Sequence, residues 1–170
     1  HNLENIMAAI VAARQSGISR ESIVKAVESF NGLPHRMEAV REVGGVCYYN
    51  DSKGTNMGAL LKSLEGVEGP VILIAGGKDK GGEYSVLKGA AAGKIKLLIL
   101  IGEAKEKMRA AVGGAVEIVM ADSLEEAVEI ASSRCAPGDT VLLSPACSSF
   151  DMFNNFEERG EQFKRLVHNL

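Results

Sequence analysis

Residues 71–82 read VILIAGGKDKGG, a short apolar run, Val71–Ala75, that leads directly into a glycine-rich loop carrying lysines. An apolar run of this length, bounded by turn residues, is typical of a strand that is buried on both faces of a sheet. Further β-rich runs occupy Leu97–Ile101, Val116–Met120 and Thr140–Leu143, and segments with helical spacing separate them. Strands that alternate with helices predict an α/β fold, with a mostly parallel sheet and helices on both of its faces.

The expected helices lie at about 57–65, 84–92, 103–112, 123–134 and 154–168. Ser123-Leu124-Glu125-Glu126 has the pattern of a capping box, which predicts where the fourth of these helices begins. Gly44-Gly45 separates the β-rich segments Met37–Val43 and Val46–Tyr49, a pattern that indicates a β-hairpin.

Residues 2–31 show the pattern of two amphipathic helices, with Ser19 as the N-cap of the second and Gly32 and Pro34 after its end. Two such helices bury little apolar surface by themselves, so their apolar faces need a partner. The chain also begins at His1 rather than at a methionine. We therefore expect it to be a piece of a longer protein.

The composition indicates an ordinary soluble globular protein, since 46% of the 170 residues are hydrophobic and 24% are charged. The net charge of −3 gives no general reason to bind nucleic acid or an anionic membrane, so any positive character must be local. We expect no membrane span, no secretory leader and a cytoplasmic location. Three widely spaced cysteines, Cys47, Cys135 and Cys147, argue against a disulfide framework and against a structural zinc site.

Three polar loops each follow a predicted strand: Asn50–Asn56 (NDSKGTN), Gly76–Gly82 (GGKDKGG) and Ser144–Phe150 (SPACSSF). Because the carboxyl ends of parallel strands lie along one edge of a sheet, we expect the loops to meet there. Their lysines, hydroxyls and backbone N–H groups suit an anion. The sequence therefore predicts one anion-binding site at this edge of the sheet.

The first loop combines several groups that could bind a nucleotide. It precedes a helix N-terminus, Lys53 adds a positive charge, and the carboxylate of Asp51 could accept hydrogen bonds from ribose hydroxyls. The alternative is that Asp51 and Ser52 only form the turn and that Asn56 only caps the next helix. Upstream, Arg36 has the planar fork that recognises phosphate, unless it is a linker arginine in a surface ion pair.

The other two loops carry weaker signals. The glycine-rich loop matches neither the GxGxxG pattern of dinucleotide binding nor a Walker A loop. Lys78 and Lys80 could bind a carboxylate or phosphate there, but on spacing alone a solvated surface loop is the simpler interpretation. In the third loop, Cys147 suggests a nucleophile with His35 as its base, although a buried and inert cysteine is the commoner case.

Taken together, these segments resemble the ATP-dependent Mur ligases of peptidoglycan synthesis, and among them the C-terminal part of the D-glutamate-adding ligases. The resemblance extends over nearly the whole chain, and the segments that carry it are residues 1–5, 33–36, 50–56, 76–77 with Lys80, 143–151 and 153–160. Asp-Ser-Lys-x-Thr-Asn and Ser-Pro-Ala-Cys-x-Ser are specific to the glutamate-adding members. Gly54 stands where the family commonly has alanine, a difference expected to loosen the turn.

The resemblance implies a complete Rossmann-like C-terminal domain at residues 34–170, preceded at residues 1–33 by the last helices of a central ATPase domain. It assigns five residues to ATP: Asn2 and Asn5 near the adenine, Asp51 on the ribose, and Arg36 and Lys53 near the phosphates. It assigns four residues to D-glutamate: Thr55, Lys80, Ser149 and Phe156. No residue of this chain is given the role of an acid, a base or a metal ligand.

The implied reaction transfers a phosphoryl group from ATP to the carboxylate of UDP-N-acetylmuramoyl-L-alanine, and the amine of D-glutamate then attacks the acyl phosphate. Such chemistry depends on positioning and charge neutralisation. The phosphate loop, a modified lysine and the Mg²⁺ ligands would lie in upstream domains of the same polypeptide, so the chain alone should be inactive. Leu33–Arg36 is the expected hinge for domain closure.

Other functions stay open. Another amide ligase of the superfamily, such as a folylpolyglutamate synthase, would share the fold, although the Asp-Ser-Lys and Ser-Pro-Ala-Cys segments speak against it. A non-catalytic nucleotide-binding module is a second alternative. A structural α/β domain whose loops bind nothing is a third.

Overall fold

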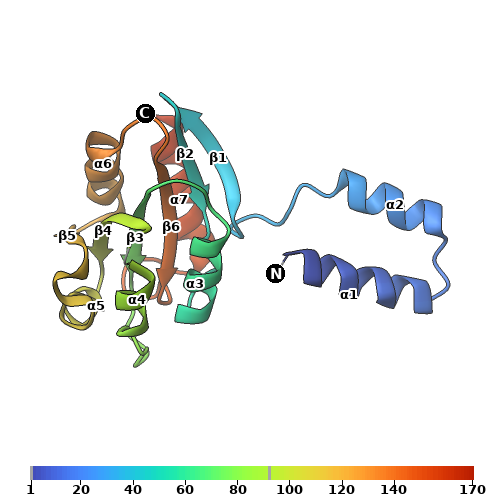
Figure 1. The fold of residues 1–170 in the computed structure, drawn as a ribbon, viewed down its shortest axis with the longest axis horizontal. Coiled ribbons are helices and arrows are strands. Elements are labelled where there is room, and N and C mark those ends of the chain that lie inside the picture. Colours follow the sequence, from blue (N-terminus) through green and yellow to red (C-terminus); the bar gives the residue numbers. More distant parts are fainter. Residues whose placement is uncertain (1, 92) are drawn as a thin grey trace. The chain divides into compact units, whose positions relative to one another are not determined.

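The computed structural model of the chain describes residues 2–91 and 93–170 (Figure 1). The chain divides into two compact units, residues 1–33 and 34–170. The first unit is a pair of helices, and the second contains the whole sheet with its covering helices.

The helical pair consists of α1 (Asn2–Gln15) and α2 (Arg20–Ser29). Ser19 has an extended backbone, and its side chain accepts a hydrogen bond from the backbone N of Ser22 at 3.2 Å, which confirms the predicted N-cap. On α1, apolar side chains at helical spacing are exposed: Leu3, Met7 and Val11. This unit therefore presents an apolar face that its own two helices do not cover.

The second unit is built on one six-stranded sheet with the order β1-β2-β6-β3-β4-β5. Its strands are β1 (Glu38–Val43), β2 (Val46–Asn50), β3 (Val71–Gly76), β4 (Ile95–Ile101), β5 (Glu117–Met120) and β6 (Thr140–Ala146). All neighbouring pairs are parallel except β1 and β2, which form the predicted hairpin around Gly44-Gly45. Both glycines have positive φ, as a tight hairpin turn requires.

Helices cover both faces of this sheet, as predicted (Figure 1). They are α3 (Met57–Glu65), α4 (Val86–Ala91), α5 (Lys105–Val112), a short 3₁₀ turn η1 (Gly113–Ala115), α6 (Leu124–Arg134) and α7 (Phe156–His168). The first three pack on one face, and α6 and α7 pack on the other. Alternate residues of β3 serve the two cores: Leu73 faces the first, while Ile72 and Ile74 face the second. That double burial explains why this strand is apolar throughout.

Capping side chains mark the N-termini of three helices. Asn56 and Asn155 accept hydrogen bonds from the first turns of α3 and α7. Ser123 caps α6 as the capping box predicted, while the returning Glu126 carboxylate accepts from the N of Asp122 rather than from the cap residue itself.

One strand boundary differs from the prediction in a way that matters. β6 continues past Leu143 to Ala146, so Ser144 and Pro145 belong to the strand rather than to a loop. β6 pairs with β2 only as far as Leu143, and its last residue Ala146 pairs with Gly76 of β3, so the longer partner β3 carries the strand on. Pro145 has no N–H to donate, and the register between β3 and β6 shifts at this point. The loop proper therefore begins after Ala146, whose φ of 58° turns the chain sharply.

Two glycines at the end of β3 let three backbones come together. Gly76 has φ 113°, and a Cβ there would lie 2.1 Å from the carbonyl oxygen of Ile101 at the end of β4. Gly77 has φ 133°, and a Cβ there would lie 2.4 Å from the carbonyl oxygen of Ser148, after β6. Only glycine fits both the dihedral angles and the space.

A buried arginine connects the loops that follow β2 and β6. Arg159 of α7 is 1% exposed; its Nε donates to Ser52 Oγ at 3.0 Å and its Nη2 to the Ser52 carbonyl at 2.9 Å. Both terminal nitrogens also donate to the carbonyl of Cys147 at 3.2 Å. Burial lowers the pKa of Arg159 to about 10, so the guanidinium still carries its charge at neutral pH. One charged group thereby ties the loop after β2 to the loop after β6.

The close approach at Gly77 can be tested by substitution. Gly77→Ala should lower the free energy of unfolding by at least about 2 kcal/mol, because it adds backbone strain and a steric clash. Gly81→Ala is the matched control, since Gly81 also has positive φ but a Cβ there meets nothing within 4 Å. Its free energy of unfolding should fall by only about 1 kcal/mol, because the alanine adds backbone strain but no clash. Urea unfolding followed by circular dichroism measures both, because the chain has no tryptophan. Equal losses would contradict the crowding at Gly77.

The role of Arg159 gives a second prediction. Arg159→Lys keeps the charge, but an ammonium cannot bond Ser52 and Cys147 together, so stability should fall by about 2–3 kcal/mol. Arg109→Lys on α5, where the arginine is exposed and paired with Glu106, should leave the urea midpoint unchanged. A stable Arg159→Lys variant would show that the guanidinium fork does not hold the loops together.

Candidate functional site

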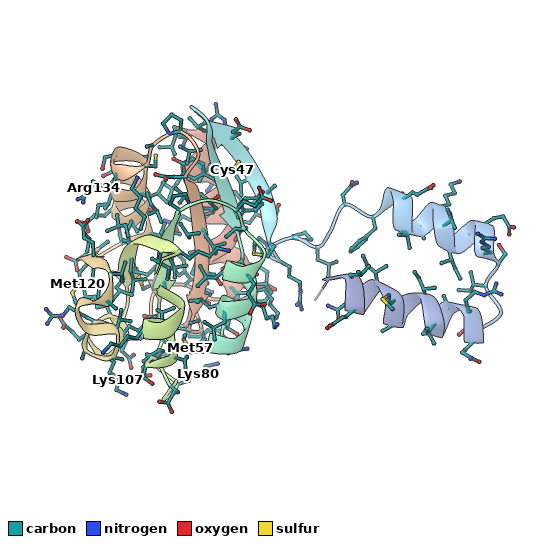
Figure 2. The ribbon with its side chains drawn as sticks, viewed as in Figure 1. Cys47, Met57, Lys80, Lys107, Met120 and Arg134 are labelled. Atoms are coloured by element: carbon teal, nitrogen blue, oxygen red, sulfur yellow. The ribbon has the colours of Figure 1, made fainter. Side chains whose placement is uncertain are left out.

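The three polar loops meet at one edge of the sheet, as the sequence predicted. The end of β6 and the loop after it lie between the others: Ala146 N donates to the Gly54 carbonyl at 2.8 Å, and Lys78 N donates to the Ser148 carbonyl at 2.9 Å. We call this edge the rim, formed by residues 50–56, 76–82 and 144–150. Figure 2 shows Lys80 of the rim at the same end of the domain as Met57, the first residue of α3.

Asp51 is a buried node of the rim. Its Oδ2 accepts hydrogen bonds from Ser63 Oγ at 2.7 Å and Ser144 Oγ at 2.8 Å, and its Oδ1 accepts a longer one from Met37 N at 3.4 Å. Burial raises the pKa of this carboxyl, while its hydroxyl partners oppose the rise. Oδ1, with one long bond among the described residues, has the greater capacity to accept a ligand hydroxyl.

Gly54 closes the turn that follows. Its N donates to the Asp51 carbonyl at 2.8 Å, and a Cβ at this position would lie 2.3 Å from Asp51 Oδ2. The turn is therefore tightly bonded and leaves no room for a Cβ in this conformation, while the expected loosening by glycine stays a prediction.

Lys53 and Phe156 lie against each other. Lys53 is exposed, and its Nζ lies 3.9 Å from the centroid of the Phe156 ring, a cation–π contact. Phe156 is fixed in turn, because its carbonyl accepts a hydrogen bond from Ser52 Oγ at 2.8 Å. The edge of the His35 ring also meets Phe156, with the centroids 5.9 Å apart. The first residue of α7 thus limits where the Lys53 ammonium can point.

Arg36 is brought to this loop by its neighbours. His35 and Met37 have positive φ, 62° and 47°, and both are held by the first loop: the His35 carbonyl accepts from Lys53 N at 3.0 Å, and Met37 N donates to Asp51. Gly160 allows this packing, since a Cβ there would lie 2.2 Å from His35 Nδ1. Arg36, exposed between them, is therefore fixed at its backbone beside Asp51 and Lys53.

The two lysines of the glycine-rich loop differ. Lys78 Nζ lies 2.5 Å from Glu103 Oε2 and is already neutralised, so its predicted role in anion binding is not supported. Lys80 is exposed, and no residue in the described ranges forms an ion pair with it. Of the two, Lys80 is the one whose charge is available to a ligand.

The remaining predicted residues divide between the two units. Ser149 is buried beside the Lys78–Ser148 bridge, and Thr55 is half-buried in the first loop. Asn5 is exposed on α1, in residues 1–33. The side chain of Asn2 lies outside the described part of the chain.

Cys147 does not fit the nucleophile hypothesis. The thiol is buried, and Tyr84 Oη lies 3.4 Å from its Sγ. Burial raises its pKa, so the thiol stays protonated at neutral pH. His35 has another partner, since its Nδ1 is 2.9 Å from Asn50 Nδ2 and accepts from that amide. The structure matches the alternative of a buried, inert cysteine.

Sequence reasoning missed Ser63 and Arg159, and it counted Ser144 only among the hydroxyls of the third loop; all three hold the rim together. Arg159 leaves a trace in the sequence, because it shares the inward face of α7 with Phe163 and Val167 at helical spacing. A charged residue on such a face needs buried partners. The two serines have no comparable signal.

Among residues 2–91 and 93–170, no group of three or more His, Cys, Asp or Glu side chains is arranged to hold a metal ion. Within the same ranges, every helix is too short or too polar to cross a membrane.

Comparison with known proteins places this geometry in a family. Residues 35–147 match the family model described as the glutamate ligase domain of Mur ligases. The chain is 55% identical over 170 residues to the UDP-N-acetylmuramoylalanine–D-glutamate ligase of Geotalea uraniireducens, covering all of this chain and 38% of that protein. A ligase of the same name from Bdellovibrio bacteriovorus is 53% identical over 167 residues, or 98% of this chain and 36% of its own length. The chain thus spans less than two fifths of the length of these relatives.

A solved structure agrees in fold. The MurF ligase of Thermotoga maritima in complex with ADP aligns with 98% of this chain and 38% of its own, with a TM-score of 0.70 and 18% identity. Since the family model covers more than half of the residues and relatives match along the whole chain at above 50% identity, this chain belongs to the Mur ligase family.

Proposed function

We propose that this chain is the C-terminal part of an ATP-dependent ligase that joins D-glutamate to UDP-N-acetylmuramoyl-L-alanine. The observation that carries the proposal is the meeting of three loops at the rim, where Lys53 and Lys80 supply positive charge in a chain of net charge −3. The relatives above 50% identity, which carry that activity in their names, support the choice of substrates.

The proposed division of labour follows from the rim. D-Glutamate carries two carboxylates, and each needs a charged or hydrogen-bonding partner once it leaves water. Lys80 supplies a charge, Thr55 and Ser149 supply hydroxyls, and the Phe156 ring bounds the site. On the side of the first loop, Arg36 and Lys53 would meet the phosphates of ATP, and Asp51 the ribose. Asn2 and Asn5 complete the proposal near the adenine.

The chemistry requires positioning more than proton transfer by this chain. The γ-phosphoryl group of ATP passes to a carboxylate oxygen of UDP-N-acetylmuramoyl-L-alanine, and ADP leaves. The amine of D-glutamate then attacks the acyl carbon, an amide bond forms and phosphate leaves. Residues of the rim would hold the amino acid so that its amine faces the acyl phosphate. We assign no acid or base to this chain.

Mg²⁺ enters the proposal only through other segments of the polypeptide. Among the described residues, no group of three or more His, Cys, Asp or Glu side chains is arranged to hold it. The phosphate loop and the modified lysine of the ATPase domain are likewise assigned to upstream domains, whose surface would also cover the apolar face of α1. The expected setting is the cytoplasm.

Domain closure completes the proposal. Leu33–Arg36 was expected to be the hinge, but His35 and the backbone around Arg36 are bonded to the first loop. We therefore narrow the hinge to Leu33-Pro34, at the boundary between the two units. Movement there would carry Arg36 together with Lys53.

A folylpolyglutamate synthase-like activity is the second candidate. FolC of E. coli in complex with ADP aligns with 97% of this chain and 39% of its own, with a TM-score of 0.69 and 19% identity. That likeness concerns the fold alone. Assaying the intact ligase with a folate and L-glutamate, in place of the muramoyl substrate and D-glutamate, separates the two functions.

Substitutions in the intact ligase test the assigned roles. Lys80→Ala should raise the KM for D-glutamate by about 10-fold or more, because a charge-assisted contact to a carboxylate is lost. Asp51→Asn keeps an acceptor for Ser63 and Ser144 but removes the charge, so it should raise the KM for ATP by about 5-fold. Steady-state kinetics with each substrate varied in turn measures both effects.

Lys88→Ala on α4, another exposed lysine of the same domain, is the control and should change neither constant. An unchanged KM for D-glutamate in Lys80→Ala would remove Lys80 from the amino acid site. Activity with the folate pair alone would refute the proposed substrates.

A further inference from the structure

Two ion pairs join the glycine-rich loop to the start of α5: in one the loop supplies the positive charge, and in the other it supplies the negative charge. Lys78 Nζ lies 2.5 Å from Glu103 Oε2, and Asp79 Oδ2 accepts a hydrogen bond from Lys107 Nζ. The backbone adds a further link, since the N of Ala104 donates to the Gly77 carbonyl at 2.9 Å. A shift of the loop by one residue would set Asp79 against Glu103, so the alternating charges favour one register.

Asp79 also shapes the backbone around Lys80. Its Oδ1 accepts a hydrogen bond from the backbone N of Gly81 at 2.9 Å. An aspartate that bonds the amide two residues further along closes a turn and fixes the residue between them. That residue is Lys80. The Asp79 carboxylate therefore determines the point and direction in which the Lys80 side chain leaves the chain.

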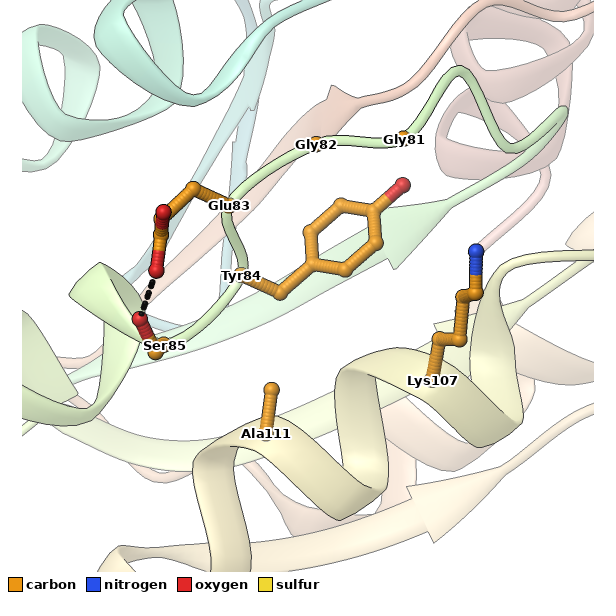
Figure 3. Close-up of a pocket in the computed structure, with 7 residues that line it drawn as sticks. All are labelled: Gly81, Gly82, Glu83, Tyr84, Ser85, Lys107 and Ala111. Atoms are coloured by element: carbon orange, nitrogen blue, oxygen red, sulfur yellow. Dashed lines mark hydrogen bonds between the residues drawn. The ribbon is translucent and has the colours of Figure 1, made fainter.

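The same carboxylate connects the turn to the loop after β6. Tyr84 Oη donates to Asp79 Oδ1 at 2.9 Å, and the same hydroxyl lies 3.4 Å from Cys147 Sγ. Figure 3 shows the Tyr84 hydroxyl and the Lys107 ammonium at the same end of the pocket, next to Gly81. The hydrogen bond from Lys107, ahead of those from Gly81 and Tyr84, lowers the pKa of Asp79 to about 2, which keeps the carboxylate ionised at neutral pH.

We propose that Asp79 is a positioning residue for the amino acid substrate, acting through Lys80. Both of its oxygens are engaged by Gly81, Tyr84 and Lys107, and its charge would repel an anionic substrate, so it does not contact the substrate itself. Anchored by Lys107, it fixes the backbone from which the Lys80 side chain extends. This role rests on the proposed function, in which Lys80 binds a carboxylate of D-glutamate.

Kinetics of the intact ligase tests the proposal. Asp79→Ala should raise the KM for D-glutamate by about 10-fold while kcat and the KM for ATP stay within about 2-fold. Asp79→Asn keeps the one acceptor oxygen that Gly81 and Tyr84 share, although it loses the bond from Lys107, and should restore most of the affinity, leaving a rise of about 3-fold. Lys105→Met is the control: it removes a comparable ion pair, to Asp122, from the same helix and should change none of these constants.

A double-mutant cycle shows whether Asp79 acts through Lys80. In a Lys80→Ala background, Asp79→Ala should raise the KM for D-glutamate no further, because the positioned group is already absent. If the two substitutions instead raised the KM for D-glutamate independently, so that their factors multiplied, the proposal would be overturned. So would losses spread evenly over kcat and over the constants for all substrates, which general damage to the fold would produce.

A readout without turnover separates this proposal from the proposed function. In ¹⁵N NMR of the 170-residue chain, the Gly81 amide should exchange with solvent faster in Asp79→Ala than in wild type, with Asp79→Asn close to wild type. Unchanged exchange at Gly81 would overturn the anchoring. A wild-type ligase that does not use D-glutamate would refute the proposed function and this role with it. Normal wild-type kinetics with an unaffected Asp79→Ala variant would overturn the positioning role alone.

Discussion

Main-chain hydrogen bonds on both sides of β6 are the constraint on which the rest of the rim depends. The Gly54 carbonyl accepts from Ala146, and the Ser148 carbonyl accepts from Lys78, so one central loop sets the spacing of its two neighbours. The bonds need no particular side chain, but they do need the strand order β2-β6-β3. Ala146 adopts a φ of 58° to make this turn, a conformation that costs a residue with a Cβ on the order of 1 kcal/mol and is held by the surrounding bonds.

Ion pairs within the domain decide which of its lysine charges are available to a ligand. Lys78 and Lys107 are neutralised by carboxylates and serve to fix the glycine-rich loop to α5. Lys53 rests on an aromatic ring, and Lys80 is left exposed at the tip of a turn. In a chain with a net negative charge, two exposed lysines without a carboxylate partner among the described residues therefore lie at one edge of the sheet.

Much of the fold follows from patterns that report burial. The apolar run of β3, the hairpin at Gly44-Gly45 and the cap at Ser123 each predicted its element, because periodicity and caps are local properties of the sequence. The extension of β6 through Ser144 and Pro145 was missed, since polar residues and a proline resemble a loop unless the neighbouring strands are known.

The site was predictable only in part for the same reason. The alternation of strands and helices indicates a parallel sheet, and in a parallel sheet the loops after the strands meet at one edge. The partners that hold each loop do not follow: Asp79 is separated by more than twenty residues from Lys107, and Arg159 by still more from Ser52. Such pairs are decided by tertiary packing, and a single sequence carries no signal that links them.

A crystal structure of the intact ligase with bound D-glutamate tests the central claim most directly. If the rim is the amino acid site, one carboxylate of D-glutamate will lie within hydrogen-bonding distance of Lys80 Nζ, with hydroxyls of Thr55 or Ser149 on its carboxylates. D-Glutamate bound away from all three loops, with Lys80 still free in solvent, would contradict the account.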